Sequence, residues 1–133
     1  METLLESYPP ERHIFVACQN LIYFGFLEFL LNQENIFISG RCNTPRRAAI
    51  LCDPIAIDVV VLDMAFADGL IQKFLVKSPA LRIIGVTRDF EKPVIQTMKL
   101  RKMHGYIYMS PLNIQRTIDC ITRVTRDELF FRF

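Results

Sequence analysis

Four polar or reactive residues each follow an apolar run in this sequence. Cys18 and Gln19 come after the first run, Asp63 after the third, and Thr87 after the fourth. A carboxylate is a ligand for hard cations such as Mg²⁺, and a thiol becomes a nucleophile once it loses its proton. A threonine hydroxyl at such a point more often satisfies an N–H of the next loop. Whether these side chains act together depends on the elements that position them.

Short runs rich in β-branched residues alternate with longer stretches of helical periodicity. The predicted strands are residues 14–17, 36–39, 57–62, 81–86 and 106–108. The predicted helices are residues 20–33, 43–51, 69–77, 91–102 and 110–126, with Asn20 as the expected N-cap of the first. This alternation predicts an α/β fold with a doubly wound, parallel sheet of five strands and right-handed crossovers. The flavodoxin-like strand order 2-1-3-4-5 is the common solution at this size.

That strand order would bring the polar residues to one edge of the sheet. Its switch point lies between the first and third strands, and ligands bind there at the carboxyl ends. The residues expected at this edge are Ala17, Cys18, Gln19, Asp63 and Thr87. Neither histidine falls there, which argues against a Cys/His hydrolase. We expect Cys18 to be a structural thiol, because the neighbouring carboxylate of Asp63 opposes its ionisation.

The composition fits one globular domain. The chain has 133 residues, 51% of them hydrophobic and 23% charged. We expect a single domain over residues 1–133, with a core at about 13–126. Residues 127–133 would be a tail or the start of a linker. The linker would lead to an output domain outside this chain, and we expect that domain to bind DNA. A net charge of +2 gives no argument for a nucleic-acid or anionic-membrane partner.

The sequence also indicates in which cellular compartment the protein works. No apolar run is long enough to cross a bilayer, so we expect no membrane partner. The four cysteines show no CxxC spacing, which indicates free thiols in the reducing cytoplasm rather than a zinc site or disulfides.

Several segments resemble the receiver domains of bacterial two-component response regulators. Residues 59–64 (VVVLDM) look like the acceptor strand of these domains, 83–87 (IIGVT) like the switch-threonine strand, and 105–108 (GYIY) like the glycine–aromatic fifth strand. Residues 38–40, followed by a helix and by Pro54, are similar to the subfamily whose full-length members end in a LuxR-type helix-turn-helix. The resemblance covers about residues 13–124 through the order and spacing of these segments.

The resemblance implies phosphoryl transfer to Asp63. In the family, a histidine kinase supplies the phosphoryl group, and Mg²⁺ is held by the aspartate and by an acidic pair after the first strand. A lysine at the end of the fifth strand contacts the phosphoryl oxygens. The threonine at the position of Thr87 then hydrogen-bonds the phosphate, and the aromatic residue at the position of Tyr106 turns inward.

Other positions depart from that pattern. The acidic pair falls on Ala17 and Cys18, or on Cys18 and Gln19 if the loop shifts by one, and the lysine position is Met109. Arg88 stands where a small side chain normally leaves room for phosphate. Mg²⁺ prefers oxygen ligands, and phosphoryl transfer needs cations around the transferred group. We therefore expect Mg²⁺ binding to be weak or lost, and we expect no cofactor, metal site or catalytic residue.

Two functions remain open from the sequence. The favoured hypothesis is an atypical pseudo-receiver, not an enzyme, that acts in transcription regulation as a phosphorylation-independent signalling, dimerisation or protein-interaction module. Asp63 would then be a carboxylate bonded to loop N–H groups or to Thr87. The alternative is a phospho-accepting receiver that uses Asp63 in an unusual site. A small α/β enzyme or flavin-binding protein is disfavoured, because no glycine-rich phosphate loop follows the first strand.

The first predicted helix carries two apolar stripes. We expect one to face the sheet, because its residues follow the i, i+4, i+7, i+8 rule; they are Ile22, Phe26, Phe29 and Leu30. The second stripe, Phe24, Leu27 and Leu31 with Tyr23 beside it, would then lie outward next to the fifth helix, and an exposed apolar patch usually marks an interface. We expect a homodimer or a protein partner on the first and fifth helices. The predicted interface is Tyr23, Phe24, Leu27, Leu31, Val124, Leu129 and Phe130.

Overall fold

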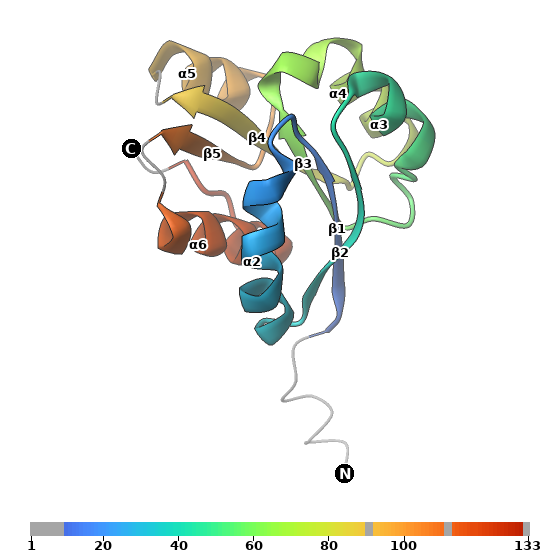
Figure 1. Cartoon of the computed structure of the whole chain (residues 1–133). Coiled ribbons are helices and arrows are strands. Elements are labelled where there is room, and N and C mark those ends of the chain that lie inside the picture. The colour runs from blue at the N-terminus through green and yellow to red at the C-terminus, as the bar shows by residue number, and fades with distance from the viewer. Residues whose placement is uncertain (1–9, 90–91, 111–112, 132–133) are drawn as a thin grey trace.

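The computed structural model describes residues 10–89, 92–110 and 113–131. Along the chain, its elements are β1 (Arg12–Ala17), α2 (Leu21–Gln33), β2 (Ile36–Cys42), α3 (Pro45–Leu51), β3 (Val59–Asp63), the 3₁₀ turn η1 (Met64–Phe66), α4 (Ala67–Lys77), β4 (Arg82–Asp89), α5 (Lys92–Leu100), β5 (Gly105–Ser110) and α6 (Ile114–Thr125). The strands form one parallel sheet in the order β2-β1-β3-β4-β5 (Figure 1). This topology confirms the predicted flavodoxin-like α/β fold.

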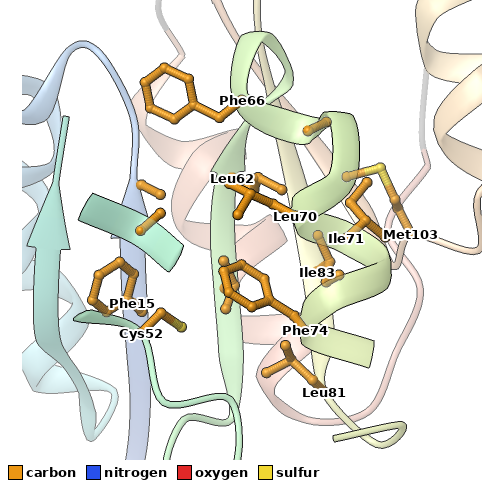
Figure 2. Close-up of a cluster of buried hydrophobic side chains, with 14 of the residues drawn as sticks. Phe15, Cys52, Leu62, Phe66, Leu70, Ile71, Phe74, Leu81, Ile83 and Met103 are labelled. Atoms are coloured by element: carbon orange, nitrogen blue, oxygen red, sulfur yellow. The ribbon is translucent and has the colours of Figure 1, made fainter. Parts of the chain in front are cut away.

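Helices cover both faces of the sheet. α2 and α6 lie side by side over one face, and α3, α4 and α5 lie over the other (Figure 1). The first four residues of the central strand β3 are apolar and completely buried. Val60 and Leu62 pack in the cluster beneath α4, where Figure 2 shows Leu70 and Phe74 pointing toward the sheet. Such a continuous apolar strand is what burial on two faces requires.

Strand β2 continues past Gly40 to Cys42, whereas the sequence predicted its end at residue 39. Gly40 pairs with Phe15, and the register between β1 and β2 shifts just before that pair. A Cβ atom at Gly40 would lie 2.7 Å from the Phe15 ring, which is too close for any side chain. The glycine therefore lets an aromatic ring approach the backbone within the strand and does not end it.

Side-chain capping sets the starts of two helices. The Thr44 side chain accepts a hydrogen bond from the Arg47 N–H at 3.2 Å, at the predicted start of α3. The Asn113 side chain accepts one from the Arg116 N–H at 2.9 Å, so α6 begins at residue 114 rather than at residue 110. Asn20, the expected cap of α2, makes no side-chain capping bond.

The predicted orientation of the first helix is wrong. In α2 the second stripe faces inward: Phe24, Leu27 and Leu31 are buried, and so is Tyr23 beside them. The stripe expected to face the sheet is exposed instead: Ile22, Phe26, Phe29 and Leu30. No helix in the described ranges, α2 included, is long and apolar enough to cross a membrane.

A buried hydrogen bond between α2 and α6 accounts for this orientation. The Tyr23 hydroxyl lies 2.8 Å from Thr117 Oγ1, and the Thr117 hydroxyl donates to the Asn113 carbonyl at 2.9 Å. Tyr23 is therefore the donor in the pair, and its one polar group is satisfied when its ring is buried. Because apolar residues occur around most of the helix, their periodicity could not identify the inner face.

The chain end packs on the domain itself. Val124 and Phe130 are buried, so they cannot belong to the exposed interface that the sequence predicted. The Phe130 N–H donates to the His104 carbonyl at 2.8 Å, and Phe130 forms a parallel bridge with Gly105 beside β5. Ordered packing therefore continues beyond residue 126, the predicted limit of the core. Leu129 is the one member of the predicted interface with an exposed side chain.

Replacement of Leu27 by alanine tests the orientation of α2. We expect Leu27→Ala to lower the free energy of unfolding by about 2–5 kcal/mol, because it leaves a cavity between the helix and the sheet. Val76→Ala is the control, since Val76 is 83% exposed on α4, and its effect should stay within about 0.5 kcal/mol. Urea denaturation followed by circular dichroism measures both. Equal losses in the two variants would contradict the observed orientation.

Candidate functional site

The Asp63 carboxylate lies at the carboxyl end of β3, where it accepts bonds from two neighbouring loops. Its Oδ1 accepts from the Ala65 N–H at 3.0 Å, at the start of the 3₁₀ turn. Its Oδ2 accepts from the Gln19 N–H at 3.2 Å and from the Cys18 thiol at 3.6 Å. The expectation that loop N–H groups bond this carboxylate is confirmed. The side chain thus ties the β1–α2 loop to the β3–α4 turn.

A pocket of about 640 Å³ opens around this carboxylate. It brings together five of the residues singled out from the sequence, namely Cys18, Gln19, Asp63, Thr87 and Met109. Its other lining residues are Asn20, Met64, Ala65, Val86 and Arg88. Ala17 is fully buried in the sheet and does not line the pocket. A pocket therefore opens at the predicted edge of the sheet.

The Cys18 thiol is held in its protonated form. Its pKa is raised to about 12, chiefly by burial. The negative charge of Asp63 and the hydrogen bond to that carboxylate contribute to this rise, and backbone bonds at Asn20 and Gln19 oppose it. The thiol donates to Asp63 Oδ2 and is almost fully shielded from solvent. A protonated, buried thiol is a poor nucleophile and a poor metal ligand. This agrees with the structural role expected for Cys18.

Charge in the pocket comes from two residues. Among the described residues that line it, Asp63 is the sole carboxylate and Arg88 the sole cation. The Arg88 side chain is exposed at the rim. Met109, at the position where the resemblance implies a lysine, is half-buried and packs against the apolar cluster under α2 and α6. A thioether brings no positive charge to the phosphoryl position.

The residues of this pocket do not fit a Mg²⁺ ion. Both oxygens of the single carboxylate already accept hydrogen bonds from the protein. The thiol beside it is protonated, and Mg²⁺ prefers oxygen ligands, usually including one or two carboxylates. Within the part of the chain that is described, no group of three histidine, cysteine or acidic side chains could hold a metal ion.

Tyr106 lies apart from the pocket and is fully buried, as the resemblance implies for an inward aromatic residue. Arg116, from the first turn of α6, places its guanidinium 4.2 Å from the centre of the Tyr106 ring and 4.9 Å from that of Tyr108. Its Nη1 donates to the Tyr106 carbonyl at 3.0 Å. Burial raises the pKa of the Tyr106 hydroxyl, and the Arg116 charge opposes that rise.

The sequence reasoning missed Arg116. This residue follows the α6 cap Asn113 by three positions, which is an ordinary place for a solvent-exposed arginine. It contacts rings from β5 and from the chain end, including Phe130 at 5.1 Å. Cation–π contacts of this kind depend on the packing of distant segments. No spacing in the sequence signals them.

Comparison with known proteins identifies the fold. No protein-family model matches the chain, and no curated protein matches its sequence. Among solved structures, it is similar to a LuxR-family two-component response regulator from Aurantimonas sp. SI85-9A1, with TM-score 0.75, 13% identity, and coverage of 92% of this chain and 89% of that one. It is also similar to a LuxR-family DNA-binding response regulator from Staphylococcus aureus, with TM-score 0.70, 14% identity and coverage of 86% and 98%.

A third similar structure is the isolated REC domain of RcsB from Salmonella enterica serovar Typhimurium, obtained with the phosphomimetic BeF3-. The TM-score is 0.76 at 14% identity, with 91% of this chain and 93% of that one covered. The fold is therefore the flavodoxin-like fold of receiver domains. At this level of identity, the likeness concerns the fold and not the chemistry of the pocket.

Alkylation of Cys18 tests the electrostatics of the site. At about pH 8, iodoacetamide should modify Cys18 far more slowly in the folded protein than in urea, because the folded thiol carries almost no thiolate. Asp63→Asn should lower the Cys18 pKa, yet leave it above 9.0, since burial is the largest cause of the shift. Mass spectrometry of the peptide that contains Cys18 measures the rate of its alkylation. Fast modification of the folded protein would contradict the assignment.

The same shift predicts how stability depends on pH. The folded pKa of Cys18 is above the unfolded value of 9.0, so the folded state keeps a proton that the unfolded state loses. The free energy of unfolding should therefore fall as the pH rises from 9.0 toward 12. Cys18→Ala removes this thiol and should show a shallower fall. An equal or steeper fall in the variant would exclude a contribution from Cys18.

Proposed function

We propose that this chain is a receiver-type domain of a two-component response regulator that signals without phosphorylation of Asp63. The observation that carries the proposal is the state of the acceptor carboxylate. It is bonded by Gln19, Ala65 and Cys18 of its own domain, and no second carboxylate is present among the described residues of its pocket.

The chemistry of phosphoryl transfer supports this proposal. The transferred group spreads negative charge over its equatorial oxygens, and receivers need cations there to stabilise it. In this pocket a thiol and an amide stand where an acidic pair would hold Mg²⁺, and Met109 stands where a lysine would act. We therefore assign the carboxylate a structural role between two loops.

The inward position of Tyr106 supports signalling that does not require phosphorylation of Asp63. Arg116 lies over its ring and bonds its carbonyl, and the chain end packs beside the same strand. These contacts hold Tyr106 in its inward position, and none of them involves Asp63. The LuxR-family proteins with this fold favour a role in transcription regulation, through a DNA-binding output domain outside this chain and in the cytoplasm.

One observation favours the alternative of an unusual phospho-acceptor. Thr87 and Arg88 both line the pocket beside Asp63, so a hydroxyl and a guanidinium lie around the position that a phosphoryl group would take. Arg88 would supply positive charge from the side of β4 rather than from the position of Met109. The proposed inactivity at Asp63 and this alternative predict opposite results with a small phosphoryl donor.

Treatment with acetyl phosphate at millimolar Mg²⁺ separates the two functions. We expect intact-protein mass spectrometry to show almost no phosphorylated chain, and beryllofluoride to leave the NMR spectrum unchanged, because the pocket lacks the ligands for the metal. Asp63→Asn should leave the output of the regulator nearly intact. Stoichiometric phosphorylation of Asp63 would contradict the proposed function and favour the alternative.

A variant with the missing groups restored is the matched control. Cys18→Asp, Gln19→Asp and Met109→Lys together supply two carboxylates and an ammonium at positions around the same pocket. We expect this triple variant to bind Mg²⁺ at millimolar concentration and to accept phosphate from acetyl phosphate. Its NMR spectrum should respond to Mg²⁺ while that of the unmodified chain does not.

A further inference from the structure

The exposed face of α2 is apolar along most of its length. Ile22, Phe26 and Phe29 are each more than two-thirds exposed, and Leu30 is 39% exposed. We call these four side chains the outer stripe. None of the helix positions on this face is charged, and Gln33 ends it. Single exposed apolar residues are common, but a contiguous set with two phenylalanines is a candidate interface.

The outer stripe has the area that a symmetric dimer needs. Two phenylalanines, an isoleucine and a leucine with these exposures offer on the order of 500 Å² per chain. Two copies that bury this surface against each other would remove on the order of 1,000 Å² from water, the lower limit for a specific interface. In a two-fold contact both partners present the same patch, so an uncharged stripe is complementary to itself.

Gly25 gives an independent reason to expect a close approach. It lies one turn before Phe29, at the edge of the outer stripe. A Cβ atom added to it would meet nothing within 4 Å. Glycine is among the least favourable residues in the interior of a helix, and the packing of this domain does not require it here. A glycine on an exposed apolar face lets the backbone of a partner helix come near.

The charges around the outer stripe are already neutralised within the chain. Glu28 is the sole charged residue of α2, and its carboxylate pairs with Arg41 at 2.9 Å. Glu34, just after the helix, pairs with Arg126 at 3.1 Å. Two copies in contact would therefore not place unpaired like charges against each other.

We propose that α2 pairs with α2 of a second copy of this chain, through the outer stripe and with Gly25 at the closest approach. This inference rests on the proposed function only where the pairing is given a role in signalling, with a second copy of the chain as the partner. The contact itself needs no phosphoryl group. It replaces the interface predicted from the sequence, whose α2 residues are buried.

Sedimentation velocity of the full chain tests the proposal without Mg²⁺ or phosphoryl donor, so phosphorylation of Asp63 in the other experiment would not affect the result. From about 5 to 200 µM, we expect the sedimenting mass to rise from one chain to two. Phe26→Glu should raise the dissociation constant at least about tenfold. Val76→Glu is the matched control, because it adds the same charge to an exposed apolar position on α4, and it should still dimerise.

Circular dichroism establishes that both variants are folded. A monomeric unmodified chain over the whole range would overturn the proposal. So would a folded Phe26→Glu variant that associates as tightly as the unmodified chain, or a Val76→Glu variant that is as weak as Phe26→Glu.

Gly25→Gln supplies a second test, in which the monomer should become more stable and the dimer weaker. Glutamine favours a helix more than glycine does, so the urea midpoint of the dilute monomer should rise. The longer side chain would hold the partner helix away, so the dissociation constant of the dimer should rise at least about tenfold. An unchanged or lower dissociation constant would overturn the close approach at Gly25.

Discussion

Burial of β3 on both faces is the constraint on which the rest of this domain depends. Four consecutive residues of the strand have no exposed surface, so helices must cover the sheet on both sides. The apolar run ends at Asp63, because a carboxylate is tolerated only where the strand leaves the core. Parallel pairing with β1 and β4 then brings the ends of those strands to the same edge. The pocket around Asp63 lies at this edge, because there the polar residues leave the buried part of the sheet together.

At that edge the protein satisfies a carboxylate with its own atoms. Two backbone N–H groups and a thiol surround Asp63, and the thiol remains protonated because burial and the carboxylate both raise its pKa. Under the proposed function, this arrangement stands in place of the free carboxylate oxygens and the cations that phosphoryl transfer needs. The fold is that of receiver domains, and the polar groups at this edge hold two loops together.

The two sides of α2 illustrate how one helix can serve two surfaces. Its inner side is fixed by apolar packing and by the buried bond from Tyr23 to Thr117, which also sets the position of α6. Its outer side keeps large apolar groups that this domain does not cover. Elsewhere, Arg116 lies over the Tyr106 ring, and Phe130 pairs with Gly105 at the start of β5. The open apolar surface of α2 and the covered start of β5 are therefore different parts of the molecule.

The sequence by itself determined the order of elements, the strand order and the edge of the sheet that Asp63 shares with Cys18 and Thr87. Alternation of β-branched runs and helices is a local signal, and parallel topology converts it into a shared edge. Only the tertiary structure decided which stripe of α2 is buried, because both stripes satisfy helical periodicity. That choice depends on Thr117, 94 residues away from Tyr23, as the packing of Tyr106 depends on Arg116 and Phe130. Contacts between such distant residues leave no pattern along the chain, so only the folded chain reveals them.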